Sequence, residues 1–148
     1  YCMEKGITSM AAALAGGNLI YESSGMTASL LGVSFEAFVL DDEMHSNTYR
    51  ALRGIEVTEE NLGFEAICQA VLGDGHFLGS QHTYAAMERD YFYPSLADRV
   101  EPRTWAANGA QDAWSRARLR AQEILNSHRP TYLTDAQDSE IRAQFNIL

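Results

Sequence analysis

Residues 16–25 read Gly-Gly-Asn-Leu-Ile-Tyr-Glu-Ser-Ser-Gly, and this stretch decides the fold class that the sequence predicts. Gly16 and Gly17 lack a Cβ atom, so the chain can adopt the left-handed conformation that closes a helix there. Residues 18–22 carry β-forming side chains at their centre, and the polar residues 23–25 follow as a loop. A helix, a glycine turn, a buried strand and a polar loop form the repeat of α/β proteins. We therefore expect a strand at residues 18–22.

The residues on both sides of this stretch favour helices. Ser34 is expected to cap a helix that runs to Arg53 and ends at Gly54. Residues 1–15 already have apolar side chains at helical spacing, namely Met3, Ile7, Met10, Ala11 and Leu14. The chain thus opens inside a helical pattern, and we expect it to be a piece of a longer protein.

Further helices are expected along the rest of the chain. They follow Thr58, run from Ser80 to Pro94, form a brief turn from Pro102 to Gly109, and continue from Gln111 to Asn126 and from Ser139 to Phe145. Cys68 falls within an apolar stripe of the first of these, so we interpret it as a buried, inert thiol. Residues 127–148 are expected to form a polar C-terminal tail. A single strand cannot close a barrel, because each barrel strand needs two hydrogen-bonded neighbours.

The charge and the cysteine pattern exclude several classes of protein. The formal net charge is −9, with 20 acidic and 11 basic side chains, so nucleic acid and anionic membrane surfaces are poor partners. The apolar stretches are shorter than the roughly 20 residues that span a bilayer. Cys2 and Cys68 form no CxxC pair, which favours a reducing compartment, and we expect a cytoplasmic protein without a metal site.

Two histidines and one carboxylate are the candidate binding groups. His76 and His82 flank a Gly-Ser turn and lack the spacing of a zinc-binding helix, so they either are structural or orient a substrate in a polar cavity. Glu22 follows the expected strand, at the end where α/β proteins build their sites, and is positioned to hold a cation. The alternative for Glu22 is an ordinary surface carboxylate. No nucleophile or other catalytic residue can be assigned.

Three further residues are expected to support this site. Tyr21 and Ser24 flank the Glu22 region. Asp42 projects into an apolar sector of the helix after Ser34, so its carboxylate needs a partner or a wet cavity. The alternative for Asp42 is a purely structural role. Aromatic residues later in the chain could contact a quaternary ammonium group, although core packing explains them as well.

Several short motifs, in this order along nearly the whole chain, resemble the trimethylamine methyltransferase family. They are Gly17-Asn18-Leu19-Ile20-Tyr21 with Ser24-Gly25-Met26, Leu40-Asp41-Asp42-Glu43 with Leu52-Arg53-Gly54-Ile55, Gly75-His76-Phe77-Leu78 with His82-Thr83, and Trp105 with Gly109 and Ile124-Leu125. Thr27-Ala28-Ser29 departs from the family, in which many relatives have an acidic residue at this point. The ordered set identifies a family more specifically than it identifies a substrate.

The resemblance implies an α/β fold, the C-terminal part of a (β/α)8 TIM-type barrel, in which residues 1–148 form a helix-rich portion of one domain. It also implies transfer of a methyl group from trimethylamine, glycine betaine or a related amine to the cobalt of a separate corrinoid protein. The chain itself then binds no cofactor, and its partners are the corrinoid protein, the amine and further copies of the same chain. We expect residues 1–148 alone to be inactive.

The abrupt start has an interpretation within this family, because some members carry pyrrolysine, whose codon also reads as a stop. The chain is then the downstream part of an interrupted reading frame. An alternative function is a non-catalytic piece that associates with the missing barrel part or with a corrinoid protein. A generic hydrolase or aldolase is disfavoured, since no nucleophile motif is present and Lys5 is the only lysine.

Overall fold

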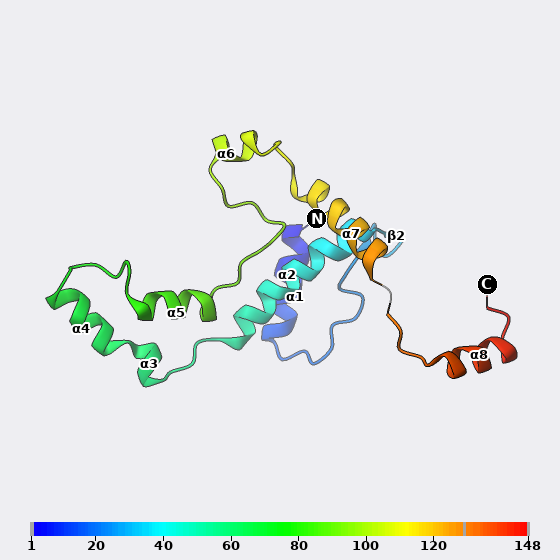
Figure 1. Cartoon of the computed structure of the whole chain (residues 1–148), viewed down its shortest axis with the longest axis horizontal. Helices are drawn as coiled ribbons and strands as arrows, with labels where there is room; N and C mark the ends of the chain where they lie inside the picture. Colours follow the sequence, from blue (N-terminus) through cyan, green and yellow to red (C-terminus); the bar gives the residue numbers. More distant parts are fainter. Residues whose placement is uncertain (1, 129, 148) are drawn as a thin grey trace.

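The computed structural model describes residues 2–128 and 130–147, without the side chain of Cys2, and it is built mainly from helices (Figure 1). The elements are α1 (Cys2–Leu14), β1 (Met26–Thr27), β2 (Gly32–Val33), α2 (Phe35–Arg53), α3 (Glu59–Leu62), α4 (Phe64–Leu72), α5 (Gln81–Asp90), α6 (Pro102–Ala107), α7 (Ala113–Ser127) and α8 (Asp135–Gln144). The expected helix-rich character is confirmed.

Helix α2 forms the centre of the fold, because α7 packs along it and α1 packs on it as well (Figure 1). Ala37 of α2 and Ala117 of α7 are completely buried, and Ala121 is 7% exposed. Short side chains at these positions allow the two helices to approach closely. The buried core of the described residues is therefore small and lies at this one crossing.

Local capping explains the bounds of α2, as the sequence predicts. The Ser34 hydroxyl accepts a hydrogen bond from the backbone N–H of Ala37 at 3.2 Å. Gly54 ends the helix with a positive φ of 68°, and its N–H donates to the carbonyl oxygen of Ala51. A side-chain cap at the start and a glycine at the end satisfy backbone groups that the helix itself leaves unpaired.

Residues 18–22 do not form the expected strand, and that prediction is wrong for this chain. Asn18 lies in a bend, Leu19 and Ile20 have no regular structure, and Tyr21 and Glu22 form a turn. A strand exists only where a neighbour completes its hydrogen-bond ladder. Among the described residues, no backbone–backbone hydrogen bond joins residues 18–22 to another segment.

The strands that do form are a short hairpin that the sequence analysis missed. β1 and β2 pair antiparallel, with Met26 opposite Val33 and Thr27 opposite Gly32. The turn between them places Ala28, Ser29 and Leu30 at positive φ values of 49°, 53° and 69°. Such residues are uncommon there, because the left-handed region crowds a Cβ atom. The usual glycine or asparagine signal of a hairpin is absent from this turn.

Several helix bounds differ from the expected ones. The helix expected after Thr58 is divided into α3 and α4 at Gly63, whose φ of 61° and ψ of 24° are left-handed. Helix α5 ends at Asp90, before Pro94, and α7 starts after its cap, Asp112. In the tail, α8 begins earlier than expected, because the side chains of Thr134 and Gln137 form a reciprocal capping box.

The segment between α5 and α6 is attached to the helical centre from two sides. The carboxylate of Glu43 on α2 accepts hydrogen bonds from the backbone N–H groups of Ser95, Leu96 and Ala97 at 2.5, 2.7 and 2.8 Å. Arg116 on α7 donates to the carbonyl oxygen of Leu96 at 2.9 Å. The Leu96 side chain is only 5% exposed. Residues 95–97 are thus held between α2 and α7.

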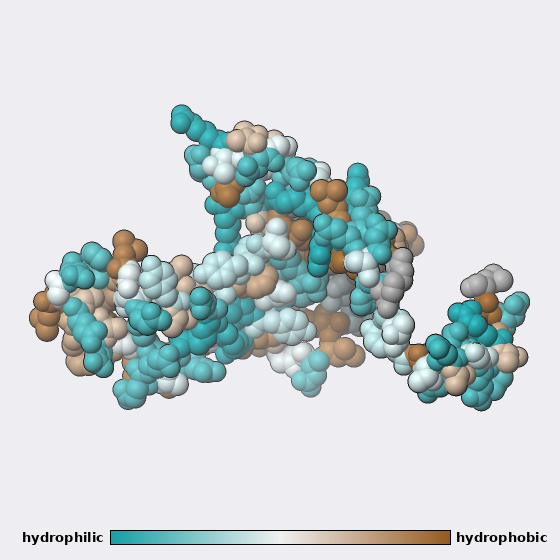
Figure 2. Space-filling view, viewed as in Figure 1, coloured by the Kyte–Doolittle hydropathy of each residue, from teal (hydrophilic) through white to brown (hydrophobic). Residues whose placement is uncertain are grey.

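Helices α3, α4 and α5 form an arm that extends from the C-terminal end of α2 (Figure 1). Large apolar side chains remain exposed on it, including Phe64, Val71, Leu72 and Leu78. Cys68 is half-buried, not buried as expected. Figure 2 shows apolar residues scattered over the visible face of the arm and around the centre. None of the described helices combines the length and the apolar character needed to cross a bilayer.

Candidate functional site

The loop at residues 23–25 is fixed to helix α2 by two side chains. Asp41 is 1% exposed, and its Oδ2 atom accepts hydrogen bonds from the backbone N–H of Gly25 at 2.8 Å and from Nζ of Lys5 at 2.5 Å. One turn further along α2, Nε2 of His45 lies 3.3 Å from the carbonyl oxygen of Ser23. The loop that the sequence assigned to a binding site therefore has a defined position.

A cavity of about 360 Å³ lies between this loop, α1 and α2, and it brings two of the expected site residues together. Ser24 and Asp42 both line it, with His45 and Tyr49 from α2. Asp42 is exposed, so its carboxylate lines a solvated cavity, one of the two environments expected for it. A carboxylate, an imidazole and a phenol ring around one cavity are chemically suited to a small cation with apolar substituents.

Tyr21 and Glu22 lie next to this cavity in sequence but do not line it. Tyr21 is 82% exposed, and Glu22 is also exposed in the turn that precedes Ser23. Glu22 has a positive φ of 53°, an unusual conformation for a residue with a side chain. The backbone of Glu22 is thus set by the turn, while its carboxylate faces solvent.

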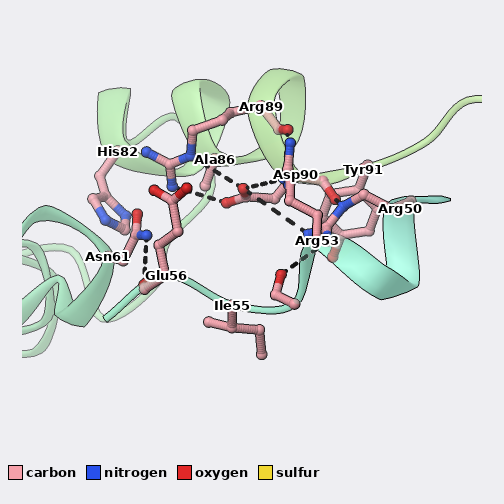
Figure 3. A pocket seen from close by; sticks show the side chains of 11 residues that line it. Arg50, Arg53, Ile55, Glu56, Asn61, His82, Ala86, Arg89, Asp90 and Tyr91 are labelled. Carbon is pink, nitrogen blue, oxygen red and sulfur yellow. Dashed lines mark hydrogen bonds and ion pairs between the residues drawn. The ribbon is translucent and has the colours of Figure 1, made fainter. Parts of the chain in front are cut away.

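His82 lies in a different cavity, of about 390 Å³, between the end of α2 and helix α5 (Figure 3). Nε2 of His82 is 2.8 Å from the carbonyl oxygen of Glu60. A Cβ atom at Gly63 would come within 3.1 Å of the His82 ring, so the glycine break between α3 and α4 leaves room for the imidazole. In the described residues, His82 therefore packs against the α3–α4 junction.

Charged side chains dominate this second cavity. The carboxylate of Asp90 pairs with Arg89 at 2.8 Å and with Arg53 at 2.9 Å, so it joins α5 to the end of α2 (Figure 3). Arg50 also donates to the backbone carbonyl of Asp90. Hydrogen bonding by Arg89 is the main reason that the pKa of Asp90 lies below its ordinary value. Through these ion pairs and hydrogen bonds, helix α5 of the arm is attached to the end of α2.

His76 stands apart from both cavities. It lies exposed in the connection between α4 and α5. Figure 1 shows that this connection forms the outer end of the arm. The structure therefore brings Ser24 and Asp42 together, with Glu22 nearby in the same loop, but places His76 and His82 on the arm. Among the described residues, no group of three or more His, Cys, Asp or Glu side chains is arranged to hold a metal ion.

Sequence reasoning missed Asp41 and His45, which fix the loop beside the first cavity. It also missed Glu43, which holds residues 95–97. The helical projection pointed to Asp42 as the inward carboxylate of α2, whereas its neighbour Asp41 is the buried one. Projection has an uncertainty of about one residue when a helix is contacted on more than one side. Lys5 offered a signal: the only lysine of the chain lies in α1 and needed an acidic partner.

Comparison with known proteins gives a consistent family match. The family described as trimethylamine methyltransferase (MTTB) matches residues 1–146. Glycine betaine methyltransferase of Desulfitobacterium hafniense (strain Y51) is 31% identical over 140 residues, which are 95% of this chain and 29% of that protein. Trimethylamine methyltransferase MttB of Desulfitobacterium hafniense (strain DSM 10664 / DCB-2) is 36% identical over 139 residues, 93% of this chain and 27% of that protein.

A relative from another genus shows the same pattern. Trimethylamine methyltransferase MttB of Methanosarcina barkeri is 34% identical over 131 residues, covering 86% of this chain and 25% of that protein. The chain thus spans between 25% and 29% of the length of these relatives. The match extends along almost all of residues 1–148 and includes both cavities described above.

Proposed function

The chain belongs to the trimethylamine methyltransferase family, and we propose that it supplies the C-terminal portion of an enzyme that transfers a methyl group from a methylated amine to a corrinoid protein. The family match over residues 1–146 is the single observation that carries this proposal. Relatives that are named for glycine betaine and for trimethylamine both match, so the donor is a tertiary or quaternary methylamine. The complete enzyme is then a (β/α)8 barrel whose other strands lie outside residues 1–148.

The proposed reaction has a simple electron balance. The carbon–nitrogen bond of the quaternary donor, or of the protonated tertiary amine, breaks, and the nitrogen keeps both electrons of that bond and leaves as a neutral amine. Cobalt(I) of the corrinoid protein supplies the electron pair for the new carbon–cobalt bond. An amine is a poor leaving group, so the enzyme must align nitrogen, carbon and cobalt and exclude water from the reacting centre. A quaternary donor needs little acid–base catalysis in this step.

The residues of this chain would act by binding and orienting the amine. We propose Glu22, His76 and His82 as the substrate-binding groups, with Tyr21, Ser24 and Asp42 in support. The loop position fixed by Asp41 and His45 supports this role for the residues around Ser24. Because His76 and His82 lie on the arm, they reach the same substrate only if the arm folds over the mouth of the complete barrel.

A chimeric protein tests the proposed function. Residues 1–148 would replace the matched 29% of the Desulfitobacterium hafniense glycine betaine methyltransferase. The chimera is incubated with a cobalt(I) corrinoid protein and a panel of methylamines, and methyl-cobalt is followed by its absorbance. We expect transfer from at least one tertiary or quaternary amine. A folded chimera that methylates cobalt with none of them would favour the alternative, a non-catalytic piece with an associating role.

Site variants of the chimera test the residue assignments. His76→Ala and Glu22→Ala are each expected to reduce the transfer rate by about tenfold or more, since a tenfold loss corresponds to about 1.4 kcal/mol of lost binding in the transition state. Glu140→Ala, in the C-terminal tail, is the control and should retain the full rate. Unchanged rates in both site variants would remove these residues from the site.

A further inference from the structure

The cavity between the end of α2 and helix α5 concentrates positive charge. The chain as a whole is acidic, with a formal net charge of −9. Nevertheless, Arg50, Arg53 and Arg89 all line this cavity, whose volume is about 390 Å³ (Figure 3). Two acidic residues, Glu56 and Asp90, line it as well, so three arginines against two carboxylates leave one positive charge. A local excess of cationic groups attracts anions. The lining therefore favours a ligand group with a single negative charge.

The contacts within the chain do not use all the donors of these arginines. Both carboxylate oxygens of Asp90 are occupied, because Oδ2 pairs with Arg89 at 2.8 Å and Oδ1 pairs with Arg53 at 2.9 Å. Nη2 of Arg50 lies 4.0 Å from Oδ1 of Asp90, which is too far for a hydrogen bond. Among the described residues, this nitrogen donates to no acceptor, whereas Nε and Nη1 of Arg50 donate to the carbonyl oxygens of Asp90 and Gly54. The Arg50 guanidinium is therefore held in place while the N–H groups of its Nη2 stay available.

The side chain of Asn61 adds an unused acceptor to the same cavity. Its Nδ2 atom donates to the carbonyl oxygen of Glu56 at 2.7 Å, and this bond orients the amide. Its Oδ1 atom is buried and accepts no hydrogen bond within the described part of the chain. Buried polar atoms nearly always have a partner, so we expect this oxygen to receive a donor from a bound molecule. The cavity thus combines unused donors on Arg50 with an unused acceptor on Asn61 (Figure 3).

From this arrangement we propose that the cavity binds a small hydroxycarboxylic acid. The carboxylate of the ligand accepts hydrogen bonds from Arg50, and the hydroxyl of the ligand donates to Oδ1 of Asn61. Planar guanidinium groups match the geometry of a carboxylate and can bind both of its oxygens. A phosphate monoester is disfavoured, because it brings close to two negative charges next to the carboxylates of Glu56 and Asp90.

The size of the cavity agrees with this class of ligand. Its volume of about 390 Å³ lies within the roughly 300–1,000 Å³ that is usual for small-molecule sites. The residues that would contact the ligand, Arg50 and Asn61, both belong to this chain. The ligand is an anion that is distinct from the methyl donor, so the site is independent of the proposed function.

A titration at constant ionic strength tests this site. Glycolate, the smallest 2-hydroxy acid, is added to the 148-residue chain, and the Nε–Hε signals of the arginines are followed by nuclear magnetic resonance. We expect saturable shifts of the signals from the arginines of the cavity. Arg50→Gln should weaken binding about tenfold, since it removes charge-assisted hydrogen bonds to the ligand. Arg50→Lys keeps the charge and should recover part of that loss. Arg142→Gln removes an arginine that pairs with Asp138 on α8, so it is the matched control and should bind glycolate like the parent chain.

Acetate distinguishes a hydroxy acid from a bare carboxylate, such as an acidic side chain of a partner protein. It differs from glycolate only by the hydroxyl group, and we expect it to bind severalfold more weakly. Asn61→Ala removes the acceptor for that hydroxyl, so acetate and glycolate should bind this variant equally well. Inorganic phosphate, the third probe, should bind more weakly than glycolate. Circular dichroism of each variant shows whether the helix content of the parent chain is retained.

A second measurement covers the case in which the arm is not ordered in the 148-residue chain alone. The chimera is titrated with the same three anions by calorimetry, and we expect the same order of affinities. Arg50→Gln should weaken glycolate binding to the chimera about tenfold as well. Asn61→Ala should again remove the preference for glycolate over acetate.

Several results would overturn the proposal. If glycolate shows no saturable binding to either protein, the cavity is only a junction between α2 and α5. Equal binding of glycolate to Arg50→Gln and to the parent would place the anion elsewhere. A preference for glycolate that persists in Asn61→Ala would remove the role of Asn61. Acetate or phosphate that binds as tightly as glycolate would exclude a hydroxy acid as the ligand. None of these measurements uses methyl transfer, so an inactive chimera would refute the proposed function without affecting the anion site.

Discussion

The helical centre and the arm are held together by different forces. In the centre, α1, α2 and α7 meet through buried alanines and through the buried Asp41. In the arm, α3, α4 and α5 are attached mainly by charged groups at the surface, with Asp90 bridging Arg53 and Arg89. Buried contacts stabilise a fold far more than exposed ion pairs do. We therefore expect the centre to be the more stable part of the chain and the arm the less stable one.

This difference indicates which part of the chain is packed less tightly. Helices as short as α3 and α4, with 4 and 9 residues, are marginal in water unless they pack against something. Phe64 and Leu72 of α4 are 74% and 87% exposed, so these apolar side chains of the arm are not covered by other described residues. The arm also carries His76 and His82. Both histidines therefore lie on the less tightly packed part of the chain.

The largest effect is expected at Asp41. Asp41→Ala should destabilise the helical centre by roughly 3 kcal/mol, because it leaves the Lys5 ammonium and the Gly25 N–H without this acceptor. Thermal or urea unfolding followed by circular dichroism measures the change. The neighbouring variant Asp42→Ala removes an exposed carboxylate and should stay within about 0.5 kcal/mol of the parent. Equal losses in the two variants would contradict the assigned burial.

A smaller, pH-dependent effect is expected at Glu43, which holds the segment between α5 and α6 on helix α2. Burial raises the pKa of Glu43, but hydrogen bonds from the amides of Leu96, Ala97 and Ser95 outweigh it, so the pKa lies below its ordinary value. The stabilisation that the Glu43 carboxylate contributes is fully present above the pKa that this group has in the unfolded chain. It is lost as the pH falls through the lower pKa of the folded chain. Glu43→Gln should therefore cost roughly 1 kcal/mol at pH 7, after allowance for partial exposure.

The pH series gives the check on that prediction. The difference in unfolding free energy between the parent chain and Glu43→Gln should narrow below about pH 4, as the carboxylate of the parent becomes protonated. Glu65→Gln on the exposed side of α4 serves as the control and should show no such trend. A difference that stays constant from pH 7 to acid would argue against the amide contacts of Glu43.

The smallest global effect is expected at Asp90, and it should be confined to the arm. Asp90→Asn weakens the contacts to Arg53 and Arg89, so hydrogen exchange along α5 should increase severalfold. The unfolding midpoint of the helical centre should not change. Glu88→Gln, which is exposed on the same helix, is the control. If Asp90→Asn lowered the midpoint as much as Asp41→Ala does, the arm and the centre would be one cooperative unit.

Local signals predicted the helices of this chain well. Ser34 and Gly54 bound α2 as expected, because capping involves residues that are close in sequence. The prediction of a strand at residues 18–22 was wrong because a strand depends on residues that are distant in sequence. Its β-forming side chains are real, but a ladder partner from elsewhere in the chain decides whether they become a strand. The hairpin of β1 and β2 was missed because Ala28, Ser29 and Leu30 take conformations that their residue types disfavour.

The candidate site was predicted only in part. Ser24 and Asp42 share a cavity, although the strand that was expected before Ser24 does not form, and their role in binding stays a prediction. The sequence did not indicate that His76 and His82 lie away from that cavity. Their position depends on the connection between α2 and α5, which sets the position of the arm. The family assignment was predicted from the ordered motifs and is confirmed over residues 1–146.

The ion pair between Lys5 and Asp41 has a practical consequence, because Lys5 is the only lysine in the chain. A reagent or enzyme that modifies lysine side chains can therefore modify this protein only at Lys5, which lies at the contact between α1 and α2. Acetylation there would remove the positive charge from beside a carboxylate that is shielded from water. One small chemical change would thus be transmitted to the loop that Asp41 holds through Gly25.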